Sequence, residues 1–213
     1  PVWSPDGKFL SFTDNKARIR VVDMEKKTIE TIDVAGNNTE RGSMGLTWSP
    51  DSKWLAYAKT GANNFRRIMI WSQSANETFA VTNAFADAFS PAWDRNRKQL
   101  YFLATTELAL GSGWANTSAM TANPDYGVYV INLQKDESSP FKLRSDEEEI
   151  TKKENGKEDS EKNDKDKDKK KEDKKEEADP EKENIKVDFE DIERRILSMP
   201  MPKRAYRFLV AGS

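Results

Sequence analysis

The sequence predicts an all-β protein: a β-propeller fragment of about three four-stranded blades plus the start of another, with a disordered charged insertion. Three observations support this prediction. A motif recurs at a fixed spacing, short β-branched and aromatic runs are separated by turn residues, and one long charged run interrupts the pattern. A period of about 40–45 residues made of short β-runs is typical of propeller blades.

The repeated motif begins with a tryptophan. Residues 3–12 (WSPDGKFLSF) recur at 48–57 (WSPDSKWLAY), and a third copy with a degraded turn stands at 93–102 (WDRNRKQLYF). The tryptophans at 3, 48 and 93 are therefore spaced by 45 residues both times. We expect these side chains to pack in the core rather than to contact a ligand, because large aromatic side chains contribute most to core packing.

Each unit can be divided into four strands. The tryptophan ends the first strand, and the Pro-Asp pair that follows is typical of a tight turn. The other expected strands are residues 8–12, 19–22 and 28–32 in the first unit, 53–57, 68–71 and 78–82 in the second, and 128–131 in the third. Residues 1–144 are thus predicted to form three blades with both faces covered, since many strands are apolar on both faces.

Loops that join the second and third strands, and those between blades, should gather on the face opposite the Pro-Asp turns. The longest of them, residues 105–126, carries Trp114, and the neighbouring loop carries Phe65 and Arg66. Long loops are often functional, and aromatic and guanidinium groups can hold a peptide by stacking and by binding its carboxylate. We therefore expect Phe65, Arg66 and Trp114 to contact substrate. The alternative is that Trp114 only pins its loop to a blade edge or a neighbouring domain.

Residues 145–184 form the charged run, with 18 acidic residues, 12 lysines and only two apolar residues. Such a segment buries too little apolar area to offset the entropy of ordering, so we expect a disordered insertion. Its net charge of −6 argues against nucleic-acid binding, and no EF-hand spacing indicates a calcium site.

The ordered chain should resume with residues 185–213. Phe189, Ile192, Ile196 and Met199 recur every three or four residues, which fits a short helix with Asp188 as its N-cap. The alternation of residues 185, 187 and 189 also allows an extended start. Residues 206–210 read as a strand of the next blade.

Composition excludes several kinds of site. The chain has no cysteine and no histidine, which removes disulfides, thiol nucleophiles, Ser–His pairs and His-ligated metals. We expect no cofactor and no metal site. No apolar run approaches the ~20 residues that cross a membrane, and the first residues lack both an initiator Met and a signal segment.

The two Trp-Ser-Pro-Asp units resemble the TolB-type propeller repeat of TolB, of tricorn-like peptidases and of prolyl-oligopeptidase relatives. Residues 187–196 (VDFEDIERRI), followed by Met-Pro-Met-Pro at 199–202, look like a segment of tricorn-like proteases, although Met199 and Met201 replace the usual aliphatic residues. The resemblance implies a large, homo-oligomeric serine peptidase with PDZ-like and catalytic domains in the same chain and peptides as substrates. This chain would then be a channel wall or gate, with no catalytic residue of its own.

Two other functions remain open at this point. A non-enzymatic, TolB-like propeller would serve as a platform for protein interactions, and a prolyl-oligopeptidase-type cap would be followed by a Gly-x-Ser-x-Gly elbow. The resemblance to tricorn-like proteases implies the cytoplasm, and the periplasm is the alternative compartment.

Overall fold

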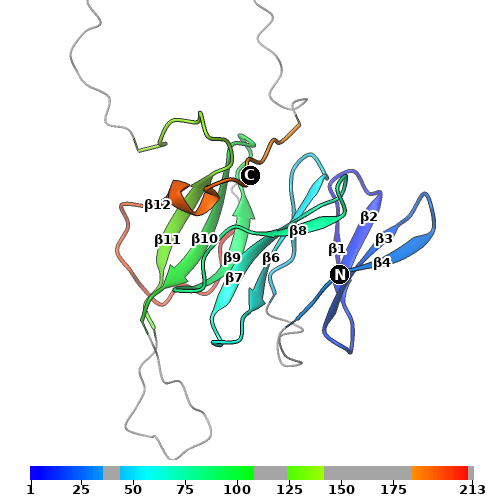
Figure 1. Cartoon of the computed structure of the whole chain (residues 1–213), viewed down its shortest axis with the longest axis horizontal. Coiled ribbons are helices and arrows are strands. Elements are labelled where there is room, and N and C mark those ends of the chain that lie inside the picture. Colours follow the sequence, from blue (N-terminus) through cyan, green and yellow to red (C-terminus); the bar gives the residue numbers. More distant parts are fainter. Residues whose placement is uncertain (36–43, 108–123, 142–183, 211–213) are drawn as a thin grey trace, which may run out of the picture.

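The computed structural model describes residues 1–35, 44–107, 124–141 and 184–210 of the chain. Three four-stranded antiparallel sheets stand side by side as blades (Figure 1). Blade 1 has the strands β1 (Val2–Trp3), β2 (Phe9–Thr13), β3 (Arg18–Asp23) and β4 (Thr28–Val34). Blade 2 has β5 (Thr47–Trp48), β6 (Trp54–Thr60), β7 (Arg66–Ser72) and β8 (Glu77–Ala80). Blade 3 has β9 (Asp87–Trp93), β10 (Gln99–Thr105), β11 (Gly127–Asn132) and β12 (Ile196–Ser198).

The strands of each sheet follow one another as a meander, so the all-β propeller prediction is confirmed. The first strands β1, β5 and β9 approach one another, and the last strands β4 and β8 also meet. In this arrangement β1, β5 and β9 lie at the inner edge of the three blades, and β4 and β8 lie at the outer edge.

The apolar core lies between the blades rather than within any one of them. Tyr57 and Trp71 of blade 2 pack with Ile19 and Val21 of blade 1. A larger cluster joins Ile68 and Ile70 of blade 2 with the apolar side chains of blade 3. This explains why β6 is buried on both faces: each face of its sheet is covered by a neighbouring blade.

In the tight hairpin turns of the described chain, the last turn residue has a left-handed backbone conformation, with positive φ. The last turn residues have φ between 52° and 71°; they are Gly7, Ala17, Lys27, Ser52, Asn64, Asn76 and Arg97. Such a residue is typical of a type I turn followed by a G1 bulge, which matches the twist of the paired strands. The same turn conformation therefore recurs in these hairpins of the described chain. Of the seven residues, only Gly7 adopts it without steric cost, because glycine has no Cβ.

The fourth strand of blade 3 differs from the prediction. Residues 1–144 supply only three strands of this sheet, and β12 pairs with β11 after the charged run, with Ile131 opposite Ile196. The predicted helix is reduced to one 3-10 turn, Ile192–Arg195, which begins after Asp191 rather than Asp188. Residues 206–210, predicted as a strand, form no regular element. The run at 145–184 lies outside the described residues apart from Asn184.

A segment that we call the strap, residues 185–191, crosses from blade 3 to blade 2. The backbone N–H of Ile185 donates to Asp51 Oδ2 at 2.7 Å, and Trp54 Nε1 donates to the carbonyl of Ile185 at 3.1 Å. The ring of Phe189 stacks on Phe79 of β8, with centroids 3.9 Å apart. The N–H of Asp188 donates to the carbonyl of Leu133, directly after β11, at 2.9 Å, so the strap contacts both blade 2 and blade 3.

Candidate functional site

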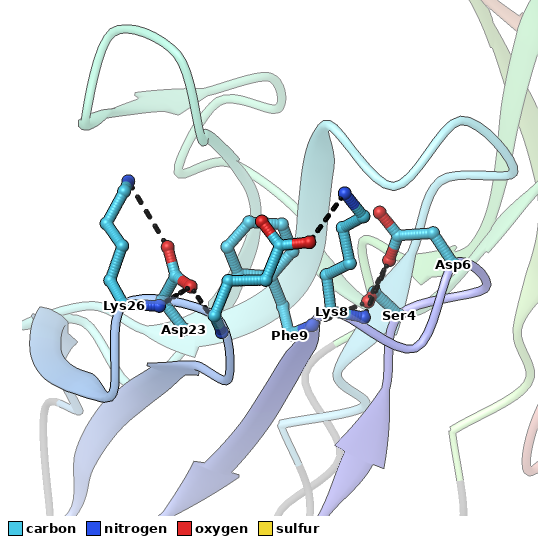
Figure 2. Close-up of polar contacts among 7 residues, drawn as sticks. Ser4, Asp6, Lys8, Phe9, Asp23 and Lys26 are labelled. Atoms are coloured by element: carbon cyan, nitrogen blue, oxygen red, sulfur yellow. Dashed lines mark hydrogen bonds and ion pairs between the residues drawn. The ribbon is translucent and has the colours of Figure 1, made fainter.

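The Ser-Pro-Asp turn is held by its own side chains (Figure 2). Ser4 Oγ donates to Asp6 Oδ1 at 2.5 Å, the N–H of Lys8 donates to the same oxygen, and the N–H of Phe9 donates to Ser4 Oγ. Burial opposes the charge on Asp6, but the hydrogen bonds from Ser4 and Lys8 outweigh it and lower the pKa of this carboxyl group. Ser49 and Asp51 repeat the arrangement in blade 2. The middle residue of each turn, Pro5 or Pro50, is thereby held in a fixed position.

These prolines line a groove of about 700 Å³ at the inner edge of the blades. Its walls are built from equivalent positions of the repeat, each pair separated by 45 residues: Gly45 and Ser90, Leu46 and Pro91, Thr47 and Ala92, Trp48 and Trp93, Pro50 and Arg95. Two copies of one motif therefore face each other across a single apolar groove. Pro5 and the segment Phe208, Leu209 and Val210 complete the lining.

The tryptophans fix the blades beside the groove. Trp48 Nε1 donates to Ser11 Oγ at 3.1 Å and to the carbonyl of Val2 at 3.3 Å, and Trp93 Nε1 donates to the carbonyl of Thr47 at 3.1 Å. Each indole thus bonds the first strand of the preceding blade. Trp48 and Trp93 are 6% and 3% exposed, as predicted for core residues, whereas Trp3 is 53% exposed.

A β-bulge in β9 shapes the side of the groove that Ser90 and Pro91 line. The pairing of β9 with β10 is irregular between Tyr101 and Leu103, opposite Ser90 and Pro91. Proline is tolerated at this place because β9 is an edge strand and a bulge needs no ladder hydrogen bond there. Ser90 has a φ of 54°, and its Oγ accepts the N–H of Leu209 at 2.8 Å. The bulge therefore ties the C-terminal described segment to the groove.

Arg95 is the charged side chain of the groove. It occupies the position that Pro5 and Pro50 hold in the other two turns, and it is exposed. No salt bridge joins Arg95 to a carboxylate anywhere in the described part of the chain. The groove can accordingly offer apolar walls and one unpaired positive charge.

Of the residues expected to contact substrate, Phe65 and Arg66 are described, and they lie outside the groove. Arg66 starts β7, and its guanidinium donates two hydrogen bonds to Asp87 of blade 3, from Nε to Oδ1 at 2.9 Å and from Nη2 to Oδ2 at 2.6 Å. Its guanidinium also lies 4.0 Å from the centre of the Phe89 ring. Burial alone would lower the pKa of Arg66, but the hydrogen bonds and the charge of Asp87 raise it.

Arg66 therefore joins blades 2 and 3. Phe65 precedes it in the loop that joins β6 to β7, where its N–H donates to Asn63 Oδ1 and its carbonyl accepts the N–H of Gly61. Neither residue lines the groove. Trp114 lies outside the described residues.

No group of three or more Asp or Glu side chains in the described ranges could hold a metal ion. No helix in the same ranges is long and apolar enough to span a bilayer.

Comparison with known proteins gives one family match along the whole chain and relatives that match part of it. Residues 1–213 match the family described as the tricorn protease second β-propeller domain. The tricorn protease of Thermoplasma volcanium is 26% identical over 147 residues, which are 64% of this chain and 14% of that protein. Tricorn protease homolog 1 of Streptomyces coelicolor is 26% identical over 102 residues, which are 48% of this chain and 9% of that protein.

A solved structure shows the same fold. The crystal structure of the tricorn protease superposes on 98% of this chain and 17% of its own, with a TM-score of 0.63 at 18% identity. The chain spans only about a tenth of the length of the curated relatives that it matches. With the match over residues 1–213, this chain belongs to the family of the tricorn protease second β-propeller domain.

Proposed function

We propose that this chain forms part of the wall and gate of a channel through which peptides reach the active site of a tricorn-like serine peptidase. One observation carries the proposal: in a member of the tricorn second-propeller family, equivalent positions of the repeat converge on one open apolar groove at the inner edge of the blades. Inner strands of a propeller surround its central channel. An extended peptide that passes along this channel would contact the groove.

We assign the chemistry of cleavage to residues outside this chain. The 213 residues contain no histidine, so they cannot form a Ser–His pair by themselves. The proposal accordingly includes peptidase and PDZ-like domains in the same parent protein, assembly into a homo-oligomer, and a cytoplasmic location. These features are drawn from the family, and this chain contributes access rather than catalysis.

The proposal also includes the loops on the face opposite the Ser-Pro-Asp turns. We propose that Phe65 and Trp114 contact peptides at that mouth of the channel. Arg66 acts differently, because both oxygens of Asp87 already hold its guanidinium. It positions the loop instead of binding a peptide carboxylate.

A variant that narrows the groove in the full-length protein tests the proposal. Thr47 lines the groove from β5, and Thr47→Trp adds bulk there. Thr31→Trp adds the same bulk to an exposed position on the outer strand β4 and is the matched control. Cleavage is measured on a fluorogenic dipeptide substrate and on an internally quenched peptide of about 20 residues.

We expect Thr47→Trp to lower kcat/KM for the long peptide several-fold more than for the short substrate, because only the long chain needs the full width of the channel. Thr31→Trp should affect neither. Equal effects on both substrates would contradict the proposed access role. A full-length protein that cleaves no peptide but captures folded proteins would favour the non-enzymatic platform instead.

A further inference from the structure

We propose that Arg95 makes the groove select extended peptides that carry acidic side chains. The inference rests on the proposed function of the groove as a peptide passage and adds a preference for one class of peptide. Its basis is a difference between copies of the repeat: two turns place proline at this position, and the third places a cation there.

The charge of Arg95 is available. Two other arginines of the described ranges are held by carboxylates, Arg18 by Asp14 and Arg66 by Asp87. Arg95 is exposed and forms no salt bridge within those ranges, although Asp94 precedes it in the sequence. Asp94 and Arg95 both line a neighbouring groove of about 520 Å³, and of the two only Arg95 also lines this one. An incoming carboxylate therefore need not displace an existing partner of Arg95.

The rest of the groove strengthens this preference. In the described part of the chain the lining contains no carboxylate and no second cation. A carboxylate that enters the groove therefore meets one exposed positive charge among mainly apolar lining residues. A guanidinium presents several N–H donors in a plane and binds a carboxylate through two of them. The complementary occupant is an extended peptide in which an Asp or Glu is flanked by apolar residues.

The surface beside Arg95 fits the flanking residues. Phe208 and Val210 are 72% and 78% exposed at the groove, and the N–H of Leu209 between them is held by Ser90. Their apolar side chains can cover a neighbouring apolar side chain of the peptide. The bound peptide would thus use one charged contact for selection and apolar contacts for affinity.

Fluorescence anisotropy with the 213-residue protein tests the inference. Two fluorescein-labelled, C-terminally amidated decapeptides are compared, identical except that two Asp residues in one are Asn in the other. The variants are Arg95→Gln and Arg95→Lys. Arg97→Gln removes an equal charge from the same turn at a position that does not line the groove, and it serves as the matched control.

We expect the Asp peptide to bind about two- to fivefold more tightly than the Asn peptide, which is the range for an exposed charge pair. Arg95→Gln should bring this ratio close to one without weakening the Asn peptide. Arg95→Lys and Arg97→Gln should keep the preference, and added salt should reduce it in every protein that shows it.

The outcomes separate this inference from the proposed function. If the Asn peptide binds and the ratio is one, or if the ratio survives Arg95→Gln, the selection by Arg95 is wrong while the peptide passage stands. If neither peptide binds, both are contradicted. A ratio lost equally in Arg95→Gln and Arg97→Gln would mean that net charge, and not the groove, makes the selection.

Discussion

At the scale of single residues, a substitution at Gly7 measures how much backbone strain a hairpin turn tolerates. Gly7 has a φ of 71°, and a Cβ added there would meet no atom within 4 Å. Any loss of stability in Gly7→Ala therefore reports the left-handed backbone alone. We expect Gly7→Ala to lower the free energy of unfolding by about 1 kcal/mol, as measured by urea denaturation.

Gly7→Asn is the matched variant for this prediction. Asn64 and Asn76 already hold the same conformation in other turns, and asparagine tolerates it better than alanine does. Gly7→Asn should accordingly cost clearly less than Gly7→Ala. Equal costs for the two variants would show that something other than backbone strain is being measured.

The carboxylate of Asp14 gives a prediction about pH. Hydrogen bonds from the Arg18 side chain, helped by the backbone N–H groups of Arg18 and Lys16, hold the pKa of Asp14 well below its ordinary value of 3.8. A carboxyl group whose pKa is lower in the folded state stabilises the fold above its unfolded pKa, and that contribution is lost as pH falls.

Wild-type stability should thus decrease between pH 5 and pH 3 more steeply than that of Asp14→Asn, in urea denaturation at each pH. Asp136→Asn is the control, since Asp136 is exposed and its carboxylate has no salt bridge or hydrogen bond to another described residue. It should keep the wild-type slope. An Asp14→Asn slope as steep as that of the wild type would contradict the role of this ion pair.

At the scale of elements, the strap joins residues that are far apart in sequence. Phe189 lies between Trp54 and Phe79, with ring centroids 5.8 Å and 3.9 Å away. Phe189→Ala removes both contacts and part of the apolar burial, so we expect it to lower the free energy of unfolding by about 1–3 kcal/mol. Thermal and urea unfolding measure this change.

Phe85→Ala is the control for the strap prediction because Phe85 is 82% exposed. It should change stability by less than about 0.5 kcal/mol. A Phe189→Ala variant as stable as Phe85→Ala would mean that the strap does not hold blades 2 and 3 together in solution.

The strands show what the sequence could and could not predict. The second, third and fourth strands of blades 1 and 2 were predictable because each copy repeats turn residues and β-branched runs at one spacing. The strand β12 was not. It has only three residues, follows the charged run, and belongs to a stretch with helical spacing from Phe189 to Met199. Its pairing with β11 is a long-range contact, which local patterns do not encode.

At the scale of the whole molecule, side chains rather than strand ladders hold the blades together. Between blades 1 and 2, Asp33 accepts hydrogen bonds from the Tyr57 hydroxyl at 2.7 Å and from Lys59 Nζ at 2.6 Å. Burial, together with the charge of Asp33 and its hydrogen bond, raises the pKa of Tyr57, so this hydroxyl stays a donor. Between blades 2 and 3, Arg66 and Asp87 form the corresponding pair.

The candidate site, the groove, forms only when the blades pack against one another. The groove exists only where β5 and β9 meet, so no single blade contains it. Part of it was still visible in the sequence, because aligning the three copies places Arg95 against Pro5 and Pro50. The pairing of Arg66 with Asp87 was not visible. The two residues are 21 positions apart in different blades, and nothing in their local sequence links them.

The central claim is that a peptide occupies the groove, and protection of a single thiol tests it most directly. The chain has no native cysteine, so Thr47→Cys and Thr31→Cys each introduce a unique labelling site, one in the groove and one on the outer strand β4. The rate of maleimide labelling is measured with and without a saturating acidic peptide. The account predicts that the peptide slows labelling of Thr47→Cys several-fold and leaves Thr31→Cys unchanged; unchanged rates at both positions would contradict it.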